Sequence, residues 1–102
     1  MNTIKLNNNE YEISSYSKNT SFYNDTPSST AYFTIIANNS NVIDGVNALA
    51  NTTITSLEIT YDGDVIYSLS NISAKIESIN ETLNTSRMDV NVNIKFENAL
   101  GA

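Results

Sequence analysis

Apolar and polar residues alternate along much of this chain, in short segments separated by polar residues. The segment STAYFTIIAN places four apolar residues on one face, at Ala31, Phe33, Ile35 and Ala37. The segment RMDVNVNIKF likewise places five apolar residues on one face, at Met88, Val90, Val92, Ile94 and Phe96. Successive side chains of a strand point to opposite faces, so a period of two predicts β-strands here. The opposite face of the first segment is also partly apolar, which predicts a central strand.

The first segment, TIKLNNNEYEI, predicts a β-hairpin. With a loop over residues 7–10, Leu6 faces Tyr11 and Ile4 faces Ile13, so apolar side chains meet as cross-strand pairs.

A second hairpin is predicted in SLEITYDGDVIYSL, turning at Asp62 and Gly63. A three-residue loop over 61–63 places Ile59 opposite Val65 and keeps one apolar face, whereas a two-residue loop places Ile59 opposite Ile66. The triplet DGD also occurs in calcium loops, but such loops need further oxygen ligands that the following residues do not supply. The triplet is therefore interpreted as a structural turn.

The period changes in the middle of the chain. SNVIDGVNALAN has Val42, Val46 and Leu49 at helical spacing, which predicts one short helix over about 41–51. Ser40 or Asn41 is the predicted N-cap, and Asp44 is placed in the first turn.

NISAKIESINETLN fits two periods. Ile72, Ile76, Ile79 and Leu83 suit a helix, while Ile72, Ala74 and Ile76 suit a strand. We favour a strand over 72–81, with a bulge near Ser78–Ile79 that brings Ile79 and Leu83 to the core. The whole chain, 1–102, is then a single domain of the mainly β class. Six to seven strands would form a small antiparallel β-sandwich or a partly open barrel, with one short helix.

Composition excludes several kinds of chemistry. The chain has no histidine and no cysteine, so the commonest metal ligand, the usual general base and thiol nucleophiles are absent, and no cofactor is expected. The formal net charge is −6 and the basic residues are scattered, which argues against nucleic-acid binding. No segment is apolar enough to cross a membrane, and the first residues do not look like a secretory signal. We expect a protein that is not an enzyme.

The best candidates for a contact site are aromatic residues around the polar segment 17–30, which is expected to be a loop. Phe22, Tyr23, Asn24 and Asp25 would form its tip, with Tyr16 nearby. Aromatic rings beside asparagines suit either a protein partner or a sugar, although such rings also commonly complete a core. The predicted strands carry asparagine and threonine on their outer faces rather than lysine, so their edges are weakly protected against pairing with other chains.

The layout from TIKLNNNEYEI to VNVNIKF, with its single helix and asparagine-rich, acidic composition, resembles small virion proteins of tailed bacteriophages, in particular tail-tube proteins. This resemblance implies a β-sandwich with one flanking helix that assembles into stacked rings, with residues 17–30 as the inter-subunit arm. It implies other virion proteins as partners, and synthesis in the host cytoplasm without a signal peptide. The chain is shorter than the tail-tube pattern, which leaves a capsid decoration protein as an alternative. A second alternative is a small β-sandwich module that binds a glycan or a protein partner.

Overall fold

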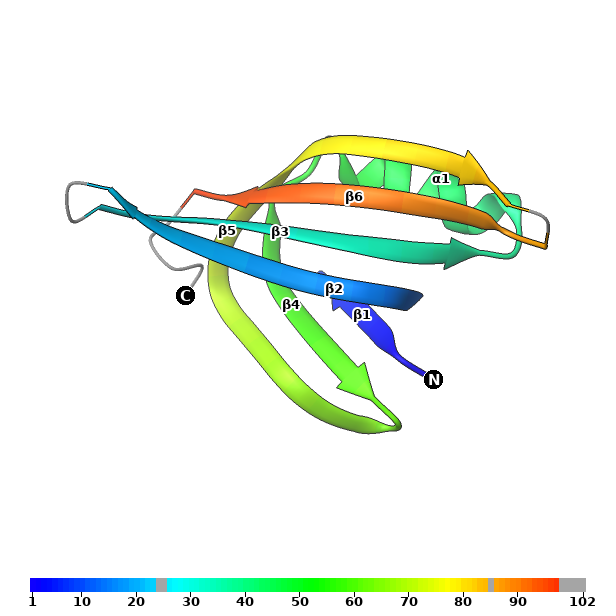
Figure 1. Cartoon of the computed structure of the whole chain (residues 1–102), viewed down its shortest axis with the longest axis horizontal. Helices are drawn as coiled ribbons and strands as arrows, with labels where there is room; N and C mark the ends of the chain where they lie inside the picture. Colours follow the sequence, from blue (N-terminus) through cyan, green and yellow to red (C-terminus); the bar gives the residue numbers. More distant parts are fainter. Residues whose placement is uncertain (24–25, 85, 98–102) are drawn as a thin grey trace.

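The computed structural model describes residues 1–23, 26–84 and 86–97, and its elements are six strands and one helix (Figure 1). They are β1 (Thr3–Leu6), β2 (Asn9–Tyr23), β3 (Thr26–Ala37), α1 (Ser40–Leu49), β4 (Ile54–Tyr61), β5 (Asp64–Leu83) and β6 (Met88–Phe96). The prediction of a mainly β, antiparallel fold with one short helix is therefore confirmed. No helix in these ranges is long and apolar enough to span a membrane.

All six strands belong to one antiparallel sheet, in the order β1-β2-β3-β6-β5-β4, and the short strand β1 closes it by pairing with both β2 and β4. Strand β5 pairs with β4 over its first half and with β6 over its second half. Between the two halves the strand curves (Figure 1). Its register with β4 shifts between Ile54 and Ser56, and Asn71 has a left-handed φ of 57°. Strand β5 therefore connects β4 with β6, as β1 connects β2 with β4.

The core is built from the alternating residues of the strands. The predicted inward positions of β3 and β6 are buried, with the end of β6, Met88, partly so. Fully buried side chains include Phe33, Ile35, Val90, Val92 and Ile94. The prediction that β3 is central is also confirmed, because it pairs with β2 on one side and with β6 on the other.

Helix α1 buries Val46 and Leu49 against this core. Its predicted N-cap was wrong by one or two residues. The cap is Asn39, which has an extended backbone and accepts a hydrogen bond from the Val42 N–H at 3.2 Å. The helix therefore starts at Ser40, and Asp44 lies beyond the first turn.

The predicted registers of the first two hairpins were wrong. The first turns at Asn7 and Asn8, so Ile4 pairs with Tyr11 rather than with Ile13. Both asparagines have positive φ, of 51° and 80°, which asparagine tolerates better than most residues. A loop of two residues matches the twist of the strands when both are left-handed.

The second hairpin also has a loop of two residues, at Asp62 and Gly63, with φ of 50° and 87°. The loop length is that of the rejected alternative, but neither predicted partner of Ile59 is observed. A register shift follows the turn: Thr60 pairs with Val65, and Ile59 pairs with Tyr67. Ile66 is the extra residue of this bulge, and it restores a common apolar face without a third loop residue.

The ambiguous segment 72–83 is a strand, as favoured. Its bulge lies between Ile76 and Ser78 rather than at Ser78–Ile79. Ile79 packs against the core, but Leu83 is 77% exposed, so its predicted core position was wrong. Leu83 is the last residue of β5, paired with Met88 where the hairpin ends.

Candidate functional site

The segment 17–30, expected to be a loop, is a β-ladder, so this prediction was wrong. Strands β2 and β3 remain paired from Ser17 and Tyr32 out to Tyr23 and Thr26. The pairing of β3 with β6 begins only at Thr30. Within the described ranges, residues 20–23 and 26–29 therefore pair only with each other. We call these two stretches the arm; it continues β2 and β3 beyond the barrel (Figure 1).

The arm is a pair of strands although its sequence does not alternate between apolar and polar residues. Its cross-strand pairs suit this structure. Thr20 and Ser29 lie opposite each other, and a hydrogen bond of 2.9 Å joins their hydroxyl groups. Pro27 lies opposite Phe22. Proline has no N–H to donate, and an edge position tolerates it because no strand is paired on the other side there.

The structure separates the residues predicted to form the contact site. Phe22 is 71% exposed on the arm, so its ring is available to a partner. Tyr16 lies six residues earlier on β2, about 20 Å away at the rise of an extended strand. Asn24, Asp25 and the side chain of Tyr23 lie outside the described part of the chain.

Tyr16 belongs instead to an aromatic cluster where the arm leaves the barrel. Its ring lies 6.3 Å from the Phe33 ring and 6.0 Å from the Tyr67 ring, measured between centroids. The Lys18 ammonium lies 5.1 Å from the centre of the Phe96 ring and donates a hydrogen bond of 3.2 Å to the Tyr67 hydroxyl. Cation–π contact and a hydrogen bond thus hold this lysine at the base of the arm.

Sequence reasoning missed Tyr67 and Phe96 in this cluster. Tyr16 and Lys18 are two residues apart in β2, so the sequence alone could place them on one face of a strand. The partners come from β5 and β6, and only the curve of β5 brings Tyr67 across from β2.

The hydroxyl of Tyr16 is buried and has no hydrogen-bond partner among the described residues. Burial raises the pKa of Tyr16 well above its usual value of 10, and the neighbouring Tyr67 adds to the rise. The unfolded chain therefore loses this proton near pH 10 while the folded protein keeps it. The folded state then binds more protons above pH 10, so its stability falls as the pH rises further.

Tyr16→Phe is expected to remove this pH dependence. Between pH 10 and 11.5 the free energy of unfolding of the wild-type protein should fall by up to about 1.4 kcal/mol per pH unit from this group alone. Urea titrations at several pH values would measure the slope. Tyr61→Phe, at an exposed position, is the control and should leave the slope unchanged. Equal slopes in the wild-type and Tyr16→Phe proteins would contradict the assignment.

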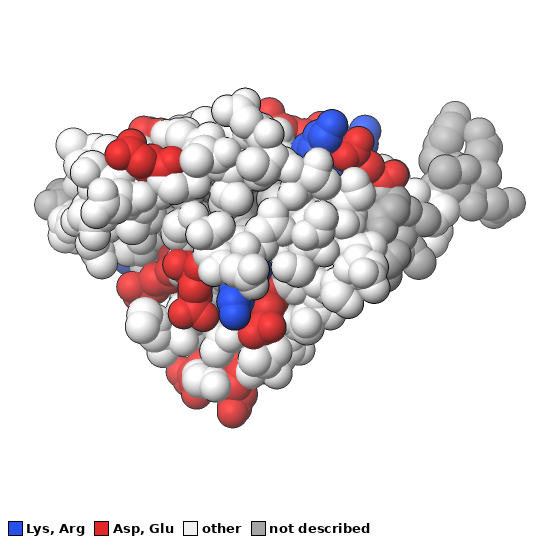
Figure 2. Space-filling model, turned by 180° about the vertical axis from the view of Figure 1, so that it is seen from behind, with Lys and Arg blue, Asp and Glu red and all other residues white. Residues whose placement is uncertain are grey.

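Acidic residues outnumber basic residues in this chain, eleven to five. Within the described ranges, no three His, Cys, Asp or Glu side chains are grouped to hold a metal ion. Figure 2 shows acidic side chains spread over one face, with the few basic ones beside them. Lys75, for example, lies 3.9 Å from Glu97.

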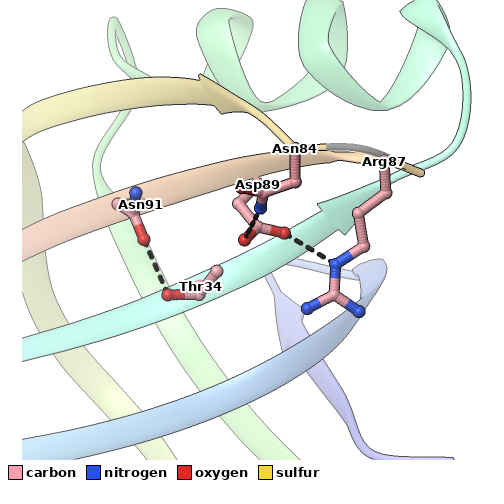
Figure 3. Close-up of polar contacts among 5 residues, drawn as sticks. All are labelled: Thr34, Asn84, Arg87, Asp89 and Asn91. Carbon is pink, nitrogen blue, oxygen red and sulfur yellow. Dashed lines mark hydrogen bonds and ion pairs between the residues drawn. The ribbon is translucent and has the colours of Figure 1, made fainter.

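The asparagine and threonine side chains of the outer sheet face are partly used within the molecule (Figure 3). Thr34 donates a hydrogen bond of 2.7 Å to Asn91 across β3 and β6. Asp89 accepts from Asn84 at 2.5 Å and from Arg87 at 2.9 Å. These side chains therefore already have hydrogen-bond partners within the molecule.

Comparison of the chain with family models, with curated proteins and with solved structures finds no match. The arm and the sheet edges are the features of the molecule from which a function can be inferred.

Proposed function

We propose that this protein is a non-enzymatic structural subunit that self-associates through the arm and through unpaired sheet edges. The observation that carries the proposal is the arm itself. Residues 20–23 and 26–29 pair with each other but with no third strand in the described part of the chain. Each outer edge of the arm therefore presents backbone N–H and C=O groups to a partner strand.

The exposed Phe22 ring supplies an apolar anchor on this arm. Burying a phenylalanine side chain contributes about 1.5–3 kcal/mol, and aromatic anchors dominate many protein interfaces. Backbone pairing gives direction to the contact, while the ring adds affinity. The unpaired backbone of the arm and the exposed Phe22 ring are both explained by association with another chain, and neither contributes to the core.

Within this proposal, the favoured setting is a phage-like particle, as a tail component. The layout and composition that resemble tail-tube proteins support it. The net charge of −6 also suits a surface past which DNA moves without binding. A capsid decoration protein would share the same chemistry and use the arm to attach to a lattice.

Replacing residues 20–29 by Asn-Gly is expected to abolish self-association. The new two-residue turn closes the hairpin at the pair Asn19–Thr30 and leaves the barrel pairing intact. Light scattering over a concentration series should show an oligomer for the wild-type protein and a folded monomer for the variant.

Phe22→Ala is the smaller companion change and should weaken association without removing it. A wild-type protein that stays monomeric at millimolar concentration would contradict the proposal and favour the binding-module alternative.

A further inference from the structure

The first half of β5 has an unpaired edge. Its residues 64–70 pair with β4 on one side, and β6 joins β5 only from Ala74 onward. In the described chain no ladder pairs with the other side of this stretch, although the side chains of Tyr16 and Lys18 of β2 contact Tyr67. We call residues 64–70 the β5 edge; it forms part of the curved strand in Figure 1.

The β5 edge lacks most of the features that protect natural edges. Residues 65–70, VIYSLS, include no charged residue and no proline. The bulge at Ile66 is one protective device, but it turns an apolar side chain outward: Ile66 is 62% exposed and Val65 is 56% exposed. An open, uncharged edge with apolar side chains is suited to receive an extended strand.

We propose that the β5 edge receives the arm of a second copy of this chain. This inference rests on the proposed function and names the surface that the arm contacts. The arm is a strand pair with free outer edges, and four of its residues, 20–23, would lie along the β5 edge. In the described part of the chain, no ladder joins the arm to β5 of the same copy. Each copy therefore brings one donor and one acceptor, and the contact joins unlike surfaces.

Apolar surface is exposed on both sides of this contact. Phe22 is the exposed ring of the arm, and Val65 and Ile66 provide exposed apolar surface on the acceptor. Exposed apolar side chains beside unpaired backbone on both surfaces favour a second copy as the partner.

The first test places lysine on the acceptor. The double variant Val65→Lys, Ile66→Lys should weaken self-association at least about tenfold, because charged side chains on an edge oppose strand pairing. Leu83→Lys is the matched control: it makes the same kind of change at an exposed apolar position of β5, outside the edge. Circular dichroism and thermal unfolding check that each variant remains folded.

A mixing experiment then tests the pairing of unlike surfaces. The arm replacement keeps its β5 edge, and the lysine double variant keeps its arm. At a concentration where the wild-type protein associates but each variant alone is monomeric, an equimolar mixture should form a 1:1 heterodimer in light scattering. A double variant that associates like the wild-type protein, or a mixture that stays monomeric, overturns the β5 edge as acceptor. If the arm replacement still abolishes association, the proposed function stands in either case. A wild-type protein that is itself monomeric overturns both.

Discussion

Phe33→Ala is expected to lower the free energy of unfolding by about 3–5 kcal/mol, the largest loss of any single change considered. Phe33 is 0% exposed at the centre of β3, between β2 and β6, and its ring packs against Tyr16. Its removal leaves a cavity that the paired strands around it cannot close. Urea unfolding at one fixed protein concentration gives the measurement, since association would otherwise add to stability.

Tyr32→Ala is the control for this change. Tyr32 is the adjacent residue on the outer face of the same strand and is 47% exposed. The same loss of a ring should cost about 1 kcal/mol there, because less surface leaves water on folding. Similar losses for the two variants would contradict the assignment of Phe33 to the centre of the core.

Much of the fold could be predicted from the sequence because hydrophobic alternation is a local signal. In β3 and β6 every second residue is apolar over seven or more positions, so strand type and inward face follow directly. The helix was predicted for the same reason, from Val42, Val46 and Leu49. In β5 the spacing of the isoleucines fits a helix as well as a strand. The segment is a strand because it pairs with β4 and β6.

The errors lie where the deciding interaction is not local. The register after Asp62 and Gly63 depends on a bulge at Ile66, which only the pairing with β4 shows. The arm was predicted as a loop because serine, threonine and asparagine carry no hydrophobic period, although threonine suits a strand. The cluster of Lys18, Tyr67 and Phe96 joins three strands, and no spacing in the sequence indicates it.

Asn7→Ala is expected to lower the free energy of unfolding by about 2–3 kcal/mol, a large effect for a turn residue. The Asn7 side chain joins the β1–β2 turn to the start of β4. Its Oδ1 accepts hydrogen bonds from the N–H of Thr55 at 2.7 Å, the hydroxyl of Thr55 at 3.1 Å and the N–H of Ser56 at 3.3 Å. Its Nδ2 donates to the carbonyl of Thr53 at 2.9 Å. Alanine removes all of these bonds and adds strain at a positive φ.

Asn8→Ala separates the two causes. Asn8 also has a positive φ, but no hydrogen bond of its side chain is found among the described residues. Its replacement should cost only the strain of a left-handed alanine, about 1–2 kcal/mol. The difference between the two variants in urea unfolding therefore measures the contribution of the Asn7 contacts to closing the sheet between β1 and β4. Equal losses would mean that backbone conformation alone makes Asn7 important, and that the pairing of β1 with β4 closes the barrel without this side chain.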